Sequence, residues 1–241
     1  MSFCKQKSYR FLILIFFCSH LYYAKTVKVQ EIFLSGDITN PNNEISGMDW
    51  YRDYLYLIPE NLNNFIYVIP KFDIDNYILS KNPSPIVPKK VDFTTPNYKR
   101  IINGFDGFEA IAFYNESVFL AIEAKESNNM KGFISWGTYN SLNHEIFIPE
   151  KNLIEVETPI QIDNMSYESI LISRNNLIIL YEANGINLQK TPKHKKLSTI
   201  DFSISTISSI NIEYRITDAT KIDSNGKFWC LNYLWPGDVV K

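Results

Sequence analysis

The sequence predicts an all-β fold, a β-propeller with about four recognisable blades. Three observations predict it: a phrase of paired apolar runs that recurs along the chain, the near absence of helical periodicity, and an aromatic fraction of 15%. Aromatic side chains suit the pleated, half-buried surface of a strand. A length of 241 residues is enough for one large all-β domain.

The repeated phrase is clearest from Gly107 to Ser127 and from Asn164 to Gly185. In each copy an aromatic residue and a Glu precede an apolar run, a polar turn follows, and a second apolar run ends in Glu-Ala. Fainter copies run from Glu44 to Asn61 and from Ile216 to Trp235. One register aligns Met48, Ile111, Ile170 and Thr220, which are 63, 59 and 50 residues apart. A repeat of roughly 40–60 residues built from paired strands is typical of propeller blades.

Short apolar runs between Asn, Asp, Gly, Ser and Pro predict the strands in chain order. We expect a strand at 28–36, a hairpin formed by "YLYLIPE" and "FIYVIPKF", and a Pro-rich loop between blades at 79–96. The second repeat adds "VFLAIEA", "GFISWGTYN" and "NLIEVETPI", and the third a hairpin around Asn184-Gly185. The segment "KHKK" at 193–196 is expected to be a solvated loop.

The blades predict an unclosed ring. Repeats two and three each supply about four strands, whereas repeat four supplies only "TDATKID" and "GKFWCLNYLW". A four-stranded fourth blade would need two more strands, and the one expected N-terminal strand can supply only one of them. A blade left incomplete has a strand edge with unpaired backbone groups. We therefore expect residues 28–241 to be a propeller domain truncated at its C-terminus, from a ring of about five or six blades.

Residues 1–24 have the pattern of a secretion signal peptide. Lys5, Lys7 and Arg10 precede a short apolar run at 11–17, which is too short to span a bilayer. We expect export to the periplasm or the extracellular space, with no transmembrane span in the mature chain. An uncleaved anchor and a lipid on Cys18 are the alternatives. Cys230 would remain alone after cleavage, which excludes an intramolecular disulfide.

The charge balance excludes nucleic acid as a partner. The net charge is −2, and loss of residues 1–24 makes it −5. The sequence has no stripe of basic residues of the kind that a nucleic-acid-binding surface needs. The expected partner is a small molecule or a protein.

The candidate chemistry lies in a register of acids. Glu109, Glu168 and Asp218 each stand at the same place in a repeat, just before its first expected strand. Ser46 takes that place in the first repeat, and Glu44 stands two residues earlier. Equivalent blade positions face one central channel, so these carboxylates should converge, as Ca²⁺ with its six to eight oxygen ligands requires. The alternative is that each acid caps backbone N–H groups. His144 is the candidate general base, because His20 lies in the signal segment and His194 in the lysine-rich segment.

Three segments, "EISGMDW", "GFEAIAF" and "YRITDATKIDSNGKFWCLNYLWPGD", resemble the bacterial phytase-like propellers, known as the "esterase-like activity of phytase" family. The last segment is also similar to gluconolactonase and regucalcin-type propellers. This second resemblance implies that Asp218, together with Glu109 and Glu168, binds a divalent metal.

Two functions follow. The first is a metal-dependent hydrolase of a small ester, lactone or phosphate, which the resemblance favours. The second is a non-catalytic propeller that binds a ligand or a protein, which the small set of bases and nucleophiles favours.

We predict that the mature protein begins after Ala24, because a small residue at the cut follows the apolar run. N-terminal sequencing of protein recovered from the cell envelope or medium checks this. A mature protein that keeps Met1 in the cytoplasm would contradict it.

Overall fold

In the computed structural model, the described residues form fifteen strands in a nine-stranded, a four-stranded and a two-stranded sheet. The repeats divide these strands into three blades of the expected propeller and a last pair of strands, which we call the fourth sheet. The model describes residues 29–61 and 64–234. The chain divides into Met1–Glu31 and Ile32–Lys241, and all elements below belong to the second unit. The predicted signal peptide, residues 1–24, lies outside the described residues.

Each repeat folds into its own blade. Blade 1 contains β1 (Ile45–Tyr51), β2 (Tyr54–Pro59), β3 (Phe65–Pro70) and β4 (Lys89–Thr94). Blade 2 contains β5 (Phe105–Tyr114), β6 (Ser117–Glu126), β7 (Asn129–Asn140), β8 (Glu145–Phe147) and β9 (Leu153–Val156). Blade 3 contains β10 (Ser169–Ser173), β11 (Asn176–Leu180), β12 (Lys193–Ser198) and β13 (Ile204–Ser208). The fourth sheet pairs β14 (Arg215–Ala219) with β15 (Cys230–Tyr233).

Helices connect the strands. They are the 3₁₀ turns η1 (Asp37–Thr39) and η2 (Pro41–Asn43), and the helices α1 (Lys71–Leu79) and α2 (Tyr98–Ile101). A short parallel pairing of Phe93 with Ile146 joins β4 to β8, so blades 1 and 2 share one continuous sheet.

Equivalent tight turns confirm the repeat register for the first three repeats, whereas the fourth anchor, Thr220, lies one residue after the end of β14 instead of within the strand. The first two strands of blades 1, 2 and 3 are joined by the two-residue hairpins 52–53, 115–116 and 174–175. Arg52, Asn115 and Arg174 each have a positive φ between 52° and 55°, which matches the twist of a two-residue hairpin. The aligned residues Met48, Ile111 and Ile170 each lie three positions before the end of their strand.

The blades pack face to face through apolar layers. Strand β5 shows how this works, because alternate side chains point to opposite faces of a strand. Ile111 and Phe113 pack against blade 1, whereas Ala110 and Ala112 pack against blade 3. Ile216 of β14 packs in the apolar layer between blade 3 and the fourth sheet. Burial on both faces explains why β6 is an almost unbroken apolar run.

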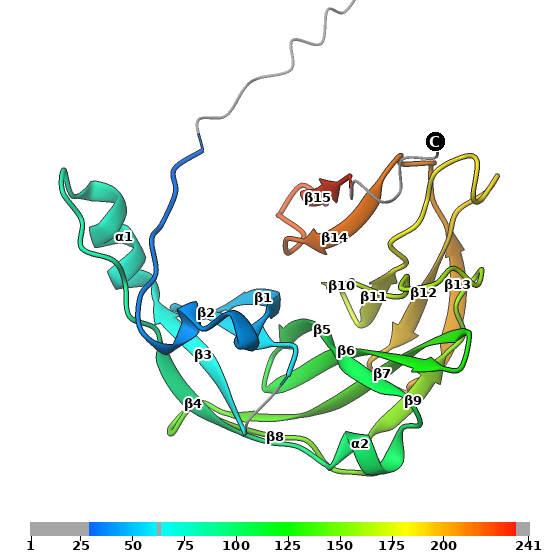
Figure 1. Ribbon diagram of the computed structural model, residues 1–241, viewed down its shortest axis with the longest axis horizontal. Coiled ribbons are helices and arrows are strands. Elements are labelled where there is room, and N and C mark those ends of the chain that lie inside the picture. The colour runs from blue at the N-terminus through cyan, green and yellow to red at the C-terminus, as the bar shows by residue number, and fades with distance from the viewer. Residues whose placement is uncertain (1–28, 62–63, 235–241) are drawn as a thin grey trace, which may run out of the picture. The chain divides into compact units, whose positions relative to one another are not determined.

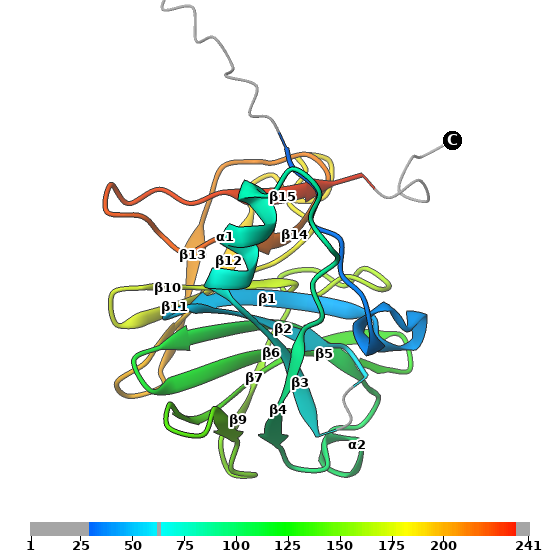
Figure 2. The same cartoon turned by 90° about the vertical axis from the view of Figure 1, so that its left-hand side faces the viewer.

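The first strands of successive blades lie side by side (Figures 1 and 2). These are β1, β5, β10 and β14. Gly47 permits the closest approach, because a Cβ there would lie 2.8 Å from Ala110 Cα and 2.9 Å from the Glu109 carbonyl oxygen. The acid positions of the repeats are thereby brought to one place.

Four local predictions are wrong. The loop expected between blades at 79–96 contains strand β4, which pairs with β3 in blade 1. Residues 29–36 form no strand, and only a bridge from Leu34 to Ile86 is present. The segment "KHKK" is part of β12, with His194 buried. Asn184-Gly185 lie in the long connection 181–192 between the antiparallel strands β11 and β12, not in a tight hairpin turn. Helix α1 was not anticipated: only Ile74 and Tyr77 of its nine residues are buried, which gives too short an apolar stripe for sequence patterning.

We predict that Gly47→Ala lowers the free energy of unfolding by roughly 1–3 kcal/mol, because backbone atoms of β5 cannot yield to the new methyl group. Chemical denaturation measures this. Gly185→Ala is the control, since its Cβ would meet only the mobile Glu213 Oε2, 2.8 Å away. Equal losses in both variants would contradict the close approach of β1 and β5.

Candidate functional site: a cavity lined by acids

Bulges in the inner strands aim side chains into one cavity. The register skips Ser46 in β1, Asp106 and Glu109 in β5, and Thr217 in β14. A bulge leaves the extra residue unpaired and turns its side chain away from the regular pleat. All four bulge residues line the same cavity.

The cavity has a volume of about 530 Å³ and receives carboxylates from all four sheets. We call it the acid cavity. Its acidic lining residues are Glu60, Asp106, Glu109, Glu123, Glu168 and Asp218. Gly107 makes room for one of them, because a Cβ at this position would lie 2.3 Å from Glu60 Cγ.

Three glutamates form the tightest cluster. Glu123, Glu168 and Glu182 each offer a carboxylate oxygen, and the three oxygens lie within 4.8 Å of one another. Glu182 Oε1 accepts a hydrogen bond of 2.8 Å from the Ser166 N–H, and its Oε2 lies 3.2 Å from Arg215 Nη1. Glu123 is 6% exposed, and its Oε2 has no hydrogen-bond partner among the described residues.

Burial and mutual repulsion disfavour the charged form of these acids. Burial, followed by the charge of Glu168, raises the pKa of Glu109 to about 9 and that of Glu123 to about 8. Burial also raises the pKa of Glu168 and of Glu182, and Arg215 opposes both shifts. Each like charge brought into a poorly solvated site adds to this cost. The cluster must therefore hold protons or a cation.

Asp218 lines the acid cavity from strand β14. Its Oδ1 accepts a hydrogen bond of 2.7 Å from the Ala219 N–H. Burial raises the pKa of Asp218, and this backbone bond partly offsets the shift. One oxygen therefore stabilises the strand end while the residue lines the acid cavity.

The structure brings together three of the four acids expected to bind metal. Glu109, Glu168 and Asp218 line the acid cavity. Glu44 is exposed outside this lining, where its Oε2 lies 3.4 Å from Asn61 Nδ2. Blade 1 contributes Glu60 instead.

The candidate base lies elsewhere. His144 Nδ1 is 2.7 Å from the Tyr139 hydroxyl, and His144 lines a separate pocket with Tyr54. His194 is structural: its Nδ1 accepts a hydrogen bond of 3.0 Å from the Tyr181 N–H, and burial lowers its pKa to about 4.

Sequence reasoning missed Glu123 and Glu182 as site residues. Both stand in the Glu-Ala pair that ends the second apolar run of the repeated phrase. Their recurrence was the available signal. The turn chemistry of the neighbouring Asn184-Gly185 obscured it.

No family model matches the chain, and none of the curated proteins matches it. Solved structures do show similarity. Two are structures of the extracellular domain of a one component or hybrid two component system from B. thetaiotaomicron, each 14% identical over 83% of this chain, with TM-scores of 0.29 and 0.31. A third is the β-propeller domain of Vanderwaltozyma polyspora Nup133, 9% identical over 89% of this chain, with a TM-score of 0.39.

The chain spans 26% of each B. thetaiotaomicron structure and 56% of the Nup133 domain. At these scores, the blade assignment rests on the strand pairing and packing described above. Within the described ranges 29–61 and 64–234, no helix combines the length and apolar character needed to cross a membrane.

We predict that, in chelator, the melting temperature falls as the pH rises from about 5 to about 9. Glu109 has its ordinary pKa of 4.5 when unfolded and about 9 when folded. Between these values the folded state binds more protons, so its stability is greatest at low pH and declines as pH rises through the folded pKa. Glu109→Gln should flatten the decline, whereas the exposed Glu116→Gln should keep it. A profile unchanged by Glu109→Gln would contradict the burial of this carboxyl.

Proposed function

We propose that the protein binds a divalent cation, Ca²⁺, in the acid cavity and uses it to bind an oxygen-rich anionic ligand. One observation carries the proposal: the buried Glu123 Oε2 is unpartnered within a group of three carboxylates whose oxygens lie within 4.8 Å of one another. A buried carboxylate oxygen without a donor is costly, and a cation offsets that cost.

The donor set favours Ca²⁺. The acidic lining offers only oxygen ligands, which hard cations prefer, and Ca²⁺ tolerates six to eight of them in flexible geometry. Glu123, Glu168 and Glu182 would hold the cation, with Glu109 and Asp218 as further acids of the same cavity. The cavity volume of about 530 Å³ leaves room for ligand oxygens.

Hydrolysis of a small ester, lactone or phosphate is the second candidate. Burial raises the pKa of Glu109 to about 9 in the cation-free site, and a general acid must hold a proton at the working pH. The resemblance to phytase-like propellers supports this activity. Binding alone is the first choice because His144, the candidate base, does not line the acid cavity.

Export supports a calcium function. The predicted signal peptide would place the protein in the periplasm or extracellular space. Extracellular calcium modules work with dissociation constants of roughly 10⁻⁴–10⁻³ M. A site of carboxylates with raised pKa values suits such modest affinity.

We predict that Ca²⁺ at about 100 times its dissociation constant raises the melting temperature by roughly 5–10 °C at neutral pH. Glu123→Gln should remove most of this shift, since it removes a ligand oxygen and its charge. Glu116→Gln on the exposed surface should keep the full shift. Differential scanning fluorimetry against a chelator-treated sample measures all three proteins.

The absence of any Ca²⁺-dependent shift in the parent protein would contradict the proposal. The same samples separate the two candidates. The hydrolase would be established if the parent protein hydrolyses p-nitrophenyl acetate or p-nitrophenyl phosphate in a calcium-dependent way and Glu109→Gln loses this activity. A Ca²⁺ shift without turnover would leave the binding function.

A further inference from the structure

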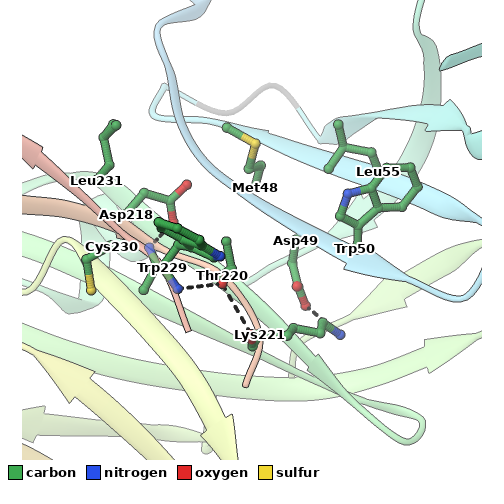
Figure 3. A pocket seen from close by; sticks show the side chains of 11 residues that line it. Met48, Asp49, Trp50, Leu55, Asp218, Thr220, Lys221, Trp229, Cys230 and Leu231 are labelled. Atoms are coloured by element: carbon green, nitrogen blue, oxygen red, sulfur yellow. Dashed lines mark hydrogen bonds and ion pairs between the residues drawn. The ribbon is translucent and has the colours of Figure 1, made fainter. Parts of the chain in front are cut away.

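Figure 3 shows a second pocket, which shares lining residues with the acid cavity. It has a volume of about 410 Å³ and lies between β1–β2 and β14–β15. We call it the tryptophan pocket, after Trp50 and Trp229 in its lining. Its other side chains are Met48, Asp49, Leu55, Asp218, Ala219, Thr220, Lys221, Cys230 and Leu231.

The polar groups in this pocket are largely satisfied by one another. Lys221 Nζ lies 3.2 Å from Asp49 Oδ2, which also accepts a hydrogen bond of 2.8 Å from the Phe113 N–H. Thr220 Oγ1 accepts a hydrogen bond of 3.0 Å from the Trp229 N–H and donates one of 3.2 Å to the Lys221 carbonyl oxygen. A ligand in this pocket would therefore meet mainly apolar surface.

That apolar surface is exposed. Trp229 is 76% exposed, Leu231 62%, Met48 49% and Trp50 40%. Pockets of roughly 300–1,000 Å³ that are mostly apolar, with a few polar groups, are typical of small-molecule sites. Single exposed apolar residues are ordinary, but a group of this size around one pocket is not.

The two pockets are adjacent. Met48, Asp218 and Leu231 line both. A ligand that spans Asp218 would have one end among the carboxylates and the other between the tryptophans. At the acid cavity the ligand would need an anionic group that binds the proposed cation. In the tryptophan pocket it would need an apolar group.

We infer that the ligand is amphipathic: an anionic, oxygen-rich head binds at the acid cavity through the cation, and an acyl chain or aryl ring occupies the tryptophan pocket. The inference rests on the proposed cation function and names its ligand class. If the inference is correct, the affinity of the protein for anionic ligands increases with the length of their apolar tail.

The experiment compares ethyl phosphate with octyl phosphate on the full chain in the presence of Ca²⁺, by isothermal titration calorimetry. Octyl phosphate should bind at least about tenfold more tightly, because each buried methylene contributes favourably. Trp50→Ala and Trp229→Ala should each reduce the ratio toward one, and both residues are exposed enough for the fold to persist. Leu142→Ala, at a residue 93% exposed and outside the pocket lining, should leave the ratio unchanged.

Equal affinities for the two phosphates in the parent protein, with an intact Ca²⁺ shift in melting temperature, would overturn this inference and leave the proposed function standing. A separate titration with octanol in chelator tests the apolar site alone. If the parent protein shows no Ca²⁺ shift but binds octanol, and Trp229→Ala does not bind it, the cation function would be overturned and the apolar site retained. Sedimentation showing a dimer that Trp229→Ala dissociates would assign the tryptophan pocket to a second copy of the chain and overturn the inference.

Discussion

The convergence of buried carboxylates is the constraint on which the structure depends. Propeller blades bring their first strands together, and the bulges of β1, β5 and β14 turn side chains toward the same space. Like charges repel there, and burial deprives them of water. Protons on Glu109 and Glu123, the guanidinium of Arg215 beside Glu182, and backbone donors offset part of this cost. The Oε2 atom of Glu123 has no hydrogen-bond partner among the described residues, and the proposed cation would offset the cost of burying it.

The apolar layers between blades maintain this arrangement. Large side chains of β5 face blade 1, and its alanines face blade 3, so one strand closes two interfaces of different thickness. Dense packing in these layers resists small displacements of the inner strands. Gly47 lets β1 approach the backbone of β5, and Gly107 frees the space that Glu60 occupies. The apolar layers therefore place the inner strands, and hydrogen bonds and the Arg215 ion pair orient individual carboxylates on them.

Asp218 connects the two halves of the proposed binding surface. Its strand end borders the acid cavity on one side and the tryptophan pocket on the other. The two surroundings differ sharply in chemistry, since one gathers carboxylates and the other exposes Trp50 and Trp229. A molecule with a charged and an apolar end can satisfy both at once, which neither a bare cation nor a simple hydrocarbon can do. Selectivity for an amphipathic ligand would then arise because it binds the acid cavity and the tryptophan pocket at once, each with moderate affinity.

The sequence by itself determined the all-β class, the blade repeats and the register that aligns Met48, Ile111 and Ile170, because hairpin turns and strand alternation are local properties. It also identified Glu109, Glu168 and Asp218 as acids that share one cavity. Only the tertiary structure decided that Glu123 and Glu182 join Glu168, and that Glu60 rather than Glu44 lines the cavity. The "KHKK" strand escaped notice because pairing with β11 and β13 overrides its polar composition. Packing between distant segments fixes which carboxylates meet, and the recurrence of Glu-Ala in the repeats does not by itself specify that contact.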